Sequence, residues 1–234
     1  MTIGYYTGNS VSNSVMRSLS KGGVKVAHIN NFQFNKNTPA VFYGILRGTG
    51  AAMKYLQMSG KDFHYLDNGY FNAVYMDENK LKDMSGKYRV VRGDMIESMD
   101  IEPAETSTGT MNVLLIPPST YTAFMYDTTP EDWNYEWGNK LSALGHSISF
   151  RKKDEGSFDD AVKDFDAVFA FNSISAIRAV ELGKAVYTTH GIIRNAHLIE
   201  NIAPYYDIYE IKEFYKNKQF TLEEIADRGI KCLN

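Results

Sequence analysis

Apolar runs alternate with amphipathic segments along the first 67 residues. Four runs are short and rich in β-branched and aromatic residues, which is typical of strands buried in a sheet. Strands are predicted at 2–7, 24–29, 40–46 and 62–66, and helices at 11–19 and 51–58. Strands that alternate with helices indicate an α/β domain with a parallel sheet.

The same pattern begins again at residue 111 and continues to the end of the chain. Strands are predicted at 111–116, 147–151, 167–171 and 185–188, and helices at 130–144, 158–165, 176–182, 192–202 and 222–228. The intervening segment, 71–110, has no clear period, so it is either a long functional excursion or a seam between two lobes. We therefore predict an α/β protein of two Rossmann-like lobes with parallel sheets, spanning 1–110 and 111–234.

The stretch from Asp164 to His190 is the clearest strand–helix–strand unit in the sequence. Its polar turn places Asn172, Ser173 and Ser175 between the carboxyl end of one strand and the amino end of a helix. Free backbone N–H groups and the helix dipole favour an anion at such a turn. Serine and asparagine are also the preferred residues for ordinary helix caps, so the turn is either a phosphate site or a simple cap.

Composition narrows the classes of protein and of partner. The 234-residue chain has a net charge of −3 and a pI near 6.0. These values argue against a protein that coats nucleic acid generally and against a protein of the membrane surface. The first 110 residues have a balance of +2 and the rest a balance of −5, so a polyanion would favour the first half.

Cys232 is the single cysteine, which excludes a disulfide framework or a cysteine zinc cluster within one chain. The sequence shows no signal peptide and no run of eighteen apolar residues. These features predict a cytoplasmic protein without a membrane partner.

The run FNSISAIRAVELGKAVYTTHG resembles the C-terminal lobe of GT-B-type glycosyltransferases. Gly183-Lys184-Ala185-Val186 matches the family's G-K-P-V, with alanine in place of proline, and Ala179 matches a small helix residue. Arg178 stands where the family has its ribose-binding glutamate, with Glu181 three residues on. The resemblance implies two lobes that face a cleft, a nucleotide-sugar donor such as a UDP-sugar as co-substrate, and no bound metal or other cofactor.

A second resemblance is to small glycosyltransferase-like proteins of bacteriophages, which carry a D-x-G-Y-F run and a later Y-R-V element. This sequence has Asp67-Asn68-Gly69-Tyr70-Phe71 and Tyr88-Arg89-Val90. The resemblance implies that the acceptor is a hydroxymethylated base in double-stranded phage DNA, and that a phage-encoded protein acts in the host cytoplasm.

Further residues are candidates for the donor site in the second half. Arg151 and Lys152 follow a strand and could grip phosphate oxygens, or they could belong to a solvated charged loop. Ser119 ends the first strand of this half, and His190 ends the last. The predicted donor site therefore comprises Ser119, Arg151, Lys152, Asn172, Ser173, Ser175, Arg178 and His190.

Asp67 is the predicted catalytic base, because it follows an apolar strand and would face the cleft. A carboxylate there could take the proton of the attacking hydroxyl, or it could simply shape the Asp-Asn-Gly turn. His64 is more typical of a packing residue. The predicted acceptor or DNA contacts are Ser10, Arg47, Tyr70, Arg89 and Arg92, where arginines meet phosphates and an aromatic ring stacks on a base.

Two other functions fit the same pattern. One is a nucleotide-sugar epimerase or phosphate-handling enzyme on the same fold, which the missing ribose-binding glutamate keeps open. The other is a non-catalytic nucleotide- or DNA-binding protein that kept the fold.

Overall fold

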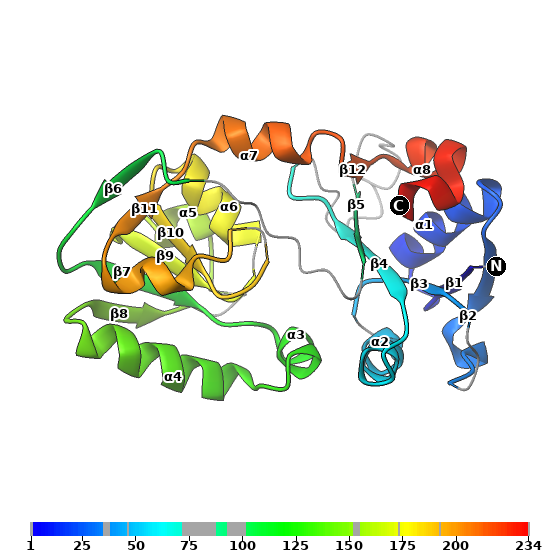
Figure 1. The fold of residues 1–234 in the computed structure, drawn as a ribbon, viewed down its shortest axis with the longest axis horizontal. Coiled ribbons are helices and arrows are strands. Elements are labelled where there is room, and N and C mark those ends of the chain that lie inside the picture. Colours follow the sequence, from blue (N-terminus) through cyan, green and yellow to red (C-terminus); the bar gives the residue numbers. More distant parts are fainter. Residues whose placement is uncertain are drawn as a thin grey trace. The chain divides into compact units, whose positions relative to one another are not determined.

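The fold is described from a computed structural model of the 234-residue chain (Figure 1). The structure describes residues 2–34, 38–45, 47–71, 88–92, 102–151, 155–172, 174–191 and 193–233.

The chain forms two compact units, and the second is inserted into the first. Unit 1 comprises Met1–Ile96 and Glu213–Asn234, and unit 2 comprises Glu97–Lys212. This division differs from the predicted one, 1–110 and 111–234, mainly because the last stretch of the chain belongs with the first unit.

Unit 1 is built on a six-stranded sheet in the order β12-β5-β4-β3-β1-β2. Four strands, β1 (Ile3–Tyr6), β2 (Lys25–His28), β3 (Ala40–Tyr43) and β4 (Phe63–Asn68), are parallel to one another. Two further strands, β5 (Tyr88–Arg92) and β12 (Gln219–Phe220), extend the sheet in antiparallel pairing. The prediction of a parallel α/β sheet is confirmed for the first four strands.

Helices cover both faces of this sheet, with α1 (Ser10–Lys21) and α8 (Leu222–Arg228) on one side and α2 (Thr49–Met58) on the other (Figure 1). The core on the α1 side joins residues from both ends of the chain, including Val15, Leu19, Phe220 and Ile225. This shared core explains why the C-terminal segment belongs to unit 1. A short 3-10 turn, η4 (Gly229–Leu233), follows α8, and another, η1 (Ile29–Asn31), follows β2.

Unit 2 is built on a four-stranded sheet in the order β10-β9-β7-β8, and every neighbouring pair is parallel. Its strands are β7 (Asn112–Ile116), β8 (Ser147–Phe150), β9 (Ala167–Ala170) and β10 (Ala185–Thr188). The two central strands, β7 and β9, are buried almost throughout, as strands covered on both faces must be.

The helices α4 (Pro130–Ala143) and α6 (Ile174–Glu181) lie on opposite sides of this sheet (Figure 1). Trp133 and Leu141 of α4 pack on Phe169 and Tyr187, while α6 buries Ile177 and Val180. Thr129 caps α4 by accepting a hydrogen bond from Asp132 N, and Pro130 occupies its first turn. The remaining elements of unit 2 are α3 (Thr120–Met125), α5 (Phe158–Ala161), η3 (Ala196–Glu200) and the antiparallel pair β6 (Glu105–Ser107) and β11 (Ala203–Tyr205).

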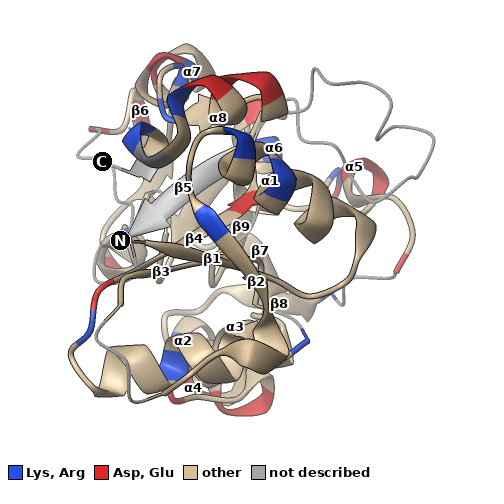
Figure 2. Cartoon of the chain, turned by 90° about the vertical axis from the view of Figure 1, so that its right-hand side faces the viewer, with Lys and Arg blue, Asp and Glu red and all other residues tan. Residues whose placement is uncertain are grey.

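Helix α7 (Ile208–Tyr215) carries the chain from unit 2 back to unit 1. Helices α7 and α8 each carry both acidic and basic residues (Figure 2), although three of the four charged residues of α8 are acidic. Among the described residues, no helix is both long enough and apolar enough to cross a lipid bilayer.

Most strand boundaries lie within one residue of those predicted, but β3 ends three residues earlier and β4 ends two residues later. Helix α8 begins and ends at the predicted residues. The predicted helix at 192–202 is instead a short 3-10 turn, η3. The sequence pattern missed α3, α7, β5, β6, β11 and β12. The last three have only two or three residues each, too few to show a period.

Candidate functional site

The carboxyl edge of the parallel sheet in unit 2 is the candidate site. The chain passes from β7 to β8 on one side and then returns to start β9 on the other side of β7. The order of the strands therefore reverses between β7 and β9. In open α/β sheets, the loops that leave the carboxyl ends of the strands diverge at this point and form a crevice where ligands bind.

Five of the predicted donor residues follow strands at this edge. Ser119 follows β7, Arg151 follows β8, Asn172 and Ser175 follow β9, and His190 follows β10. Because all four strands are parallel, their carboxyl ends lie at one edge of the sheet. Lys152 and Ser173 lie outside the described residues.

Ser119 acts as the cap of α3. Its Oγ accepts a hydrogen bond from Thr122 N at 3.1 Å and lies 2.9 Å from the Thr122 hydroxyl. The side chain is exposed. Ser119 therefore performs the ordinary capping role of a serine, and a contact with a ligand would come in addition to this role.

Arg151 is the most unusual residue at this edge, because a charged side chain is only 7% exposed. Its Nη2 donates a hydrogen bond to Gly156 O at 2.8 Å, and its guanidinium lies 5.6 Å from the centre of the Phe158 ring. Its Nε is buried and has no hydrogen-bond partner. Among the described residues no carboxylate pairs with Arg151, whereas buried charges in proteins are normally paired.

Asn172 lies at the end of β9 and is half-buried. Gly191, which follows β10, has a φ of +84°, and a Cβ at that position would collide with the Asn172 amide. Glycine is therefore required there for two reasons, the backbone conformation and the close approach. This contact brings the loop after β10 directly against the turn after β9.

His190 is packed between aromatic rings at the same edge. Its imidazole stacks on Phe171, with ring centres 4.3 Å apart and planes 20° apart, and lies 4.4 Å from the ring of Tyr126. Burial, with a smaller contribution from the Arg194 charge, lowers the pKa of His190 from 6.5 to about 4. The ring is therefore neutral at neutral pH.

A buried amide holds the loop that follows His190. Asn195 is 4% exposed; its Oδ1 accepts a hydrogen bond from Thr188 N, and its Nδ2 donates to Val186 O, both at 2.8 Å. Nδ2 also contacts the Tyr206 hydroxyl at 2.6 Å, and Arg194 N donates to the Thr188 hydroxyl at 2.8 Å. These contacts hold Arg194 and Asn195 against β10.

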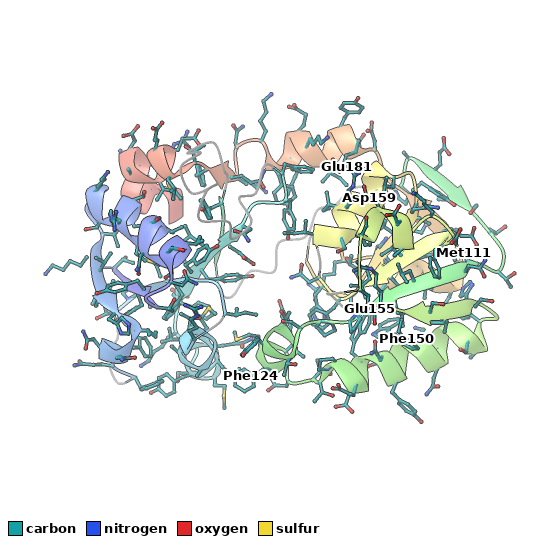
Figure 3. All side chains as sticks on the ribbon, turned by 180° about the vertical axis from the view of Figure 1, so that it is seen from behind. Met111, Phe124, Phe150, Glu155, Asp159 and Glu181 are labelled. Atoms are coloured by element: carbon teal, nitrogen blue, oxygen red, sulfur yellow. The ribbon has the colours of Figure 1, made fainter. Side chains whose placement is uncertain are left out.

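Arg178 does not point to this edge in the way that the resemblance implies. Its guanidinium is held by Asp159, through Nε at 3.0 Å and through Nη2, and by Glu181 at 2.8 Å. Both carboxylates belong to helices of unit 2 and are labelled in Figure 3. These ion pairs raise the pKa of Arg178 and lower that of Asp159. A ribose or phosphate contact by Arg178 would require both pairs to break.

Unit 1 has the same strand order in its parallel part, β4-β3-β1-β2, and so has its own reversal point between β1 and β3. Two predicted acceptor contacts follow these strands. Ser10 is the exposed first residue of α1, and Arg47 is exposed with a φ of +59° just before α2. They lie at one edge of this sheet because β1 and β3 are parallel neighbours.

Asp67 lies inside β4 and not in the turn after it, so the predicted end of this strand requires correction. In the antiparallel pairing it is opposite Arg89 of β5. Its Oδ1 accepts a hydrogen bond from Asn68 N at 2.8 Å. The strand continues to Asn68 because β5 supplies a partner that the sequence pattern did not reveal.

The remaining acceptor candidates are Tyr70, Arg89 and Arg92. Tyr70 is only 7% exposed and packs edge-on against Tyr215 at 4.9 Å, which is at odds with the predicted role of stacking on a base. The backbones of Arg89 and Arg92 lie in β5, and their side chains are outside the described part of the structure.

Sequence reasoning missed several residues that shape the edge in unit 2: Tyr126, Trp133, Thr189, Arg194 and Asn195. Trp133 lay in a predicted helix and Thr189 beside a predicted strand, but neither spacing nor residue type linked them to His190. Among the described residues, no group of three or more His, Cys, Asp or Glu side chains could hold a metal ion.

Comparison of the sequence with protein-family models and with curated proteins finds no match.

Proposed function

We propose that this protein is a glycosyltransferase that binds the diphosphate of a nucleotide sugar at the carboxyl edge of the sheet in unit 2. The donor class, a UDP-sugar, and the acceptor, a hydroxyl such as that of a hydroxymethylated base in phage DNA, come from the resemblances described above. Arg151, Asn172 and His190 line the donor site, and Asp67 is the base.

The buried guanidinium of Arg151 is the observation that carries this proposal. No carboxylate in the described part of the chain pairs with this buried cation, and an anionic ligand would supply such a partner and lower the cost of its burial. Arginine matches the geometry of phosphate oxygens through two parallel hydrogen bonds. Arg151 follows the end of β8, so it lies at the carboxyl edge of the sheet, which is the edge at which α/β proteins bind nucleotides.

The proposed reaction breaks the bond between the anomeric carbon and the diphosphate oxygen and forms a bond from that carbon to the acceptor oxygen. The acceptor proton passes to the Asp67 carboxylate. The departing diphosphate keeps the bonding electron pair, and Arg151 stabilises the charge that develops on it.

Calorimetric titration with UDP and with UDP-glucose tests the donor site. We expect both ligands to bind the wild-type protein. Arg151→Met should lower the affinity for each ligand by about tenfold to a hundredfold, which is the usual contribution of a charge-assisted hydrogen bond. Lys163→Met is the matched control. It also removes one cation from unit 2, but Lys163 is exposed and pairs with Asp160 at 2.6 Å. Equal losses in both variants, or no binding by the wild type, would overturn the proposal.

Transfer is tested separately, by measuring UDP released from UDP-glucose in the presence of hydroxymethylated DNA and of unmodified DNA. We expect release only with the hydroxymethylated DNA, and Asp67→Asn to abolish release while UDP binding persists. If Asp67→Asn changes nothing, Asp67 is not the base.

The ion pairs of Arg178 favour a second candidate, a nucleotide-sugar epimerase or phosphate-handling enzyme. The side chain at the ribose-binding position of GT-B enzymes is here an arginine that two carboxylates already hold. A changed sugar or released phosphate after incubation with UDP-glucose alone would support this function over transfer.

A further inference from the structure

The hydroxyl of Thr189 makes three polar contacts. It lies 3.3 Å from Phe171 O, 3.3 Å from Trp133 Nε1 and 3.1 Å from His190 Nδ1. A threonine hydroxyl has one proton to donate and two lone pairs to accept with. The indole Nε1 can only donate, so it uses one lone pair, and Phe171 O can only accept.

The state of His190 follows from counting these contacts. If the hydroxyl proton is donated to Phe171 O, the second lone pair is free to accept from Nδ1–H, and all three contacts are hydrogen bonds. If the proton is donated to Nδ1 instead, the contact with Phe171 O is lost. The arrangement that keeps all three contacts therefore places the ring proton of His190 on Nδ1.

The other ring nitrogen is then a bare acceptor. None of the described residues donates a hydrogen bond to His190 Nε2, and this atom is not among the buried polar atoms that lack a partner. His190 as a whole is half-buried, and it lies at the carboxyl edge of the sheet. Because the ring stays neutral at neutral pH, as described above, this nitrogen presents a lone pair and not a positive charge.

We propose that His190 is a specificity-determining residue whose Nε2 accepts a hydrogen bond from a hydroxyl group of the bound ligand. This inference rests on the proposed nucleotide-sugar function. A lone pair repels phosphate oxygens, so His190 does not serve the diphosphate, for which Arg151 supplies the cation. The ligand groups that carry donor hydroxyls are the ribose and the transferred sugar.

The tautomer can be measured without any ligand, by nitrogen-15 NMR of the histidine ring in the labelled protein. We expect a protonated Nδ1 and an unprotonated Nε2 at pH 7. Thr189→Val keeps the shape of the side chain but removes the hydroxyl, and we expect it to yield a mixture of tautomers. A wild-type ring protonated on Nε2 would overturn the inference.

Binding distinguishes the two sources of the hydroxyl. His190→Phe keeps a stacked ring and removes the hydrogen-bond acceptor. We expect it to lower the affinity for UDP-glucose by about fivefold to thirtyfold. If the sugar supplies the hydroxyl, UDP binds wild type and variant equally. If the ribose supplies it, UDP loses affinity in the variant, while 2′-deoxy-UDP or 3′-deoxy-UDP does not.

The outcomes separate this inference from the proposed function. If all these ligands bind the wild type and His190→Phe equally well, the role of His190 is refuted while the donor site stands. If none of them binds the wild type, the proposed function fails and the role of His190 fails with it.

Discussion

At the residue scale, unit 2 combines a buried cation, Arg151, with which no carboxylate of the described residues pairs, and a histidine that burial keeps neutral. Both features concern electrostatic free energy, so both have consequences for stability that can be measured in the absence of any ligand.

Arg151→Met should leave the ligand-free protein at least as stable as the wild type. Methionine fills much of the same space without a buried charge, and taking a single ion out of water costs several kcal/mol in a protein interior. The loss of the hydrogen bond to Gly156 O would offset about 1 kcal/mol. Urea unfolding checks this, and a loss of more than about 1 kcal/mol would mean that Arg151 is structural.

His190 should make unit 2 less stable in mild acid. Its folded pKa, about 4, lies below the ordinary value of 6.5, so the unfolded chain binds the proton more readily. The contribution of His190 is fully present above pH 6.5 and is lost as the pH falls towards 4. We expect a loss of about 1–2 kcal/mol, less than the full shift implies because the ring is partly exposed.

Unfolding measured at pH 7 and pH 4.5 checks this prediction. His190→Phe cannot be protonated and should show a smaller difference in stability between the two values of pH. The same difference in both proteins would show that other groups cause it.

At the element scale, two glycines allow α1 and α8 to meet. Gly22 follows α1, and a Cβ there would lie 2.8 Å from Gly229 N and 2.9 Å from Ala226 O at the end of α8. The neighbouring atoms belong to backbone, which cannot move aside as a flexible side chain can. The contact therefore couples the N-terminal and C-terminal segments of unit 1.

Gly22→Ala should destabilise unit 1 by about 1–3 kcal/mol, the usual cost of inserting atoms into a packed site. Ser20→Ala is the control, because Ser20 is an exposed residue of the same helix and should change stability by less than about 0.5 kcal/mol. Thermal unfolding of both variants checks this, and equal melting temperatures would show that the two helices can separate at no cost.

Sequence patterns predicted the long elements well and their partners poorly. The apolar runs at β3, β7, β9 and β10 and the capped helix α4 were evident, because burial on both faces and capping leave local signals. The residues at the carboxyl edge of the sheet in unit 2 could be predicted once those strands were located, because they come directly after them in the sequence. The burial of Tyr70 could not be foreseen, since its partner Tyr215 is far away in the sequence. The pairing of Arg178 with Asp159 was hidden for the same reason.

At the scale of the whole molecule, the two units share one strand order in their parallel sheets, and each has a reversal point with polar residues at its carboxyl edge. The two units differ in how their elements are distributed along the chain. Unit 2 is formed by one continuous stretch of sequence, whereas unit 1 takes β12 and α8 from the end of the chain.

A chain that stops after residue 212 should keep unit 2 folded and lose unit 1. The truncation removes Phe220, Leu222 and Ile225, which are buried in the core with α1. Amide hydrogen exchange checks this, with protection expected to persist in β7, β9 and β10 and to vanish in β1 and β3. Protection retained in β1 and β3 would show that the first segment folds alone.

The return of the chain from unit 2 to unit 1 also has a consequence during synthesis on the ribosome. The strands of unit 2 emerge in one continuous stretch, while the N-terminal segment must wait, with part of its apolar surface uncovered, until residues 213–234 have left the exit tunnel. The segment made first is thus completed last, and chaperones that bind nascent chains would meet it in that interval.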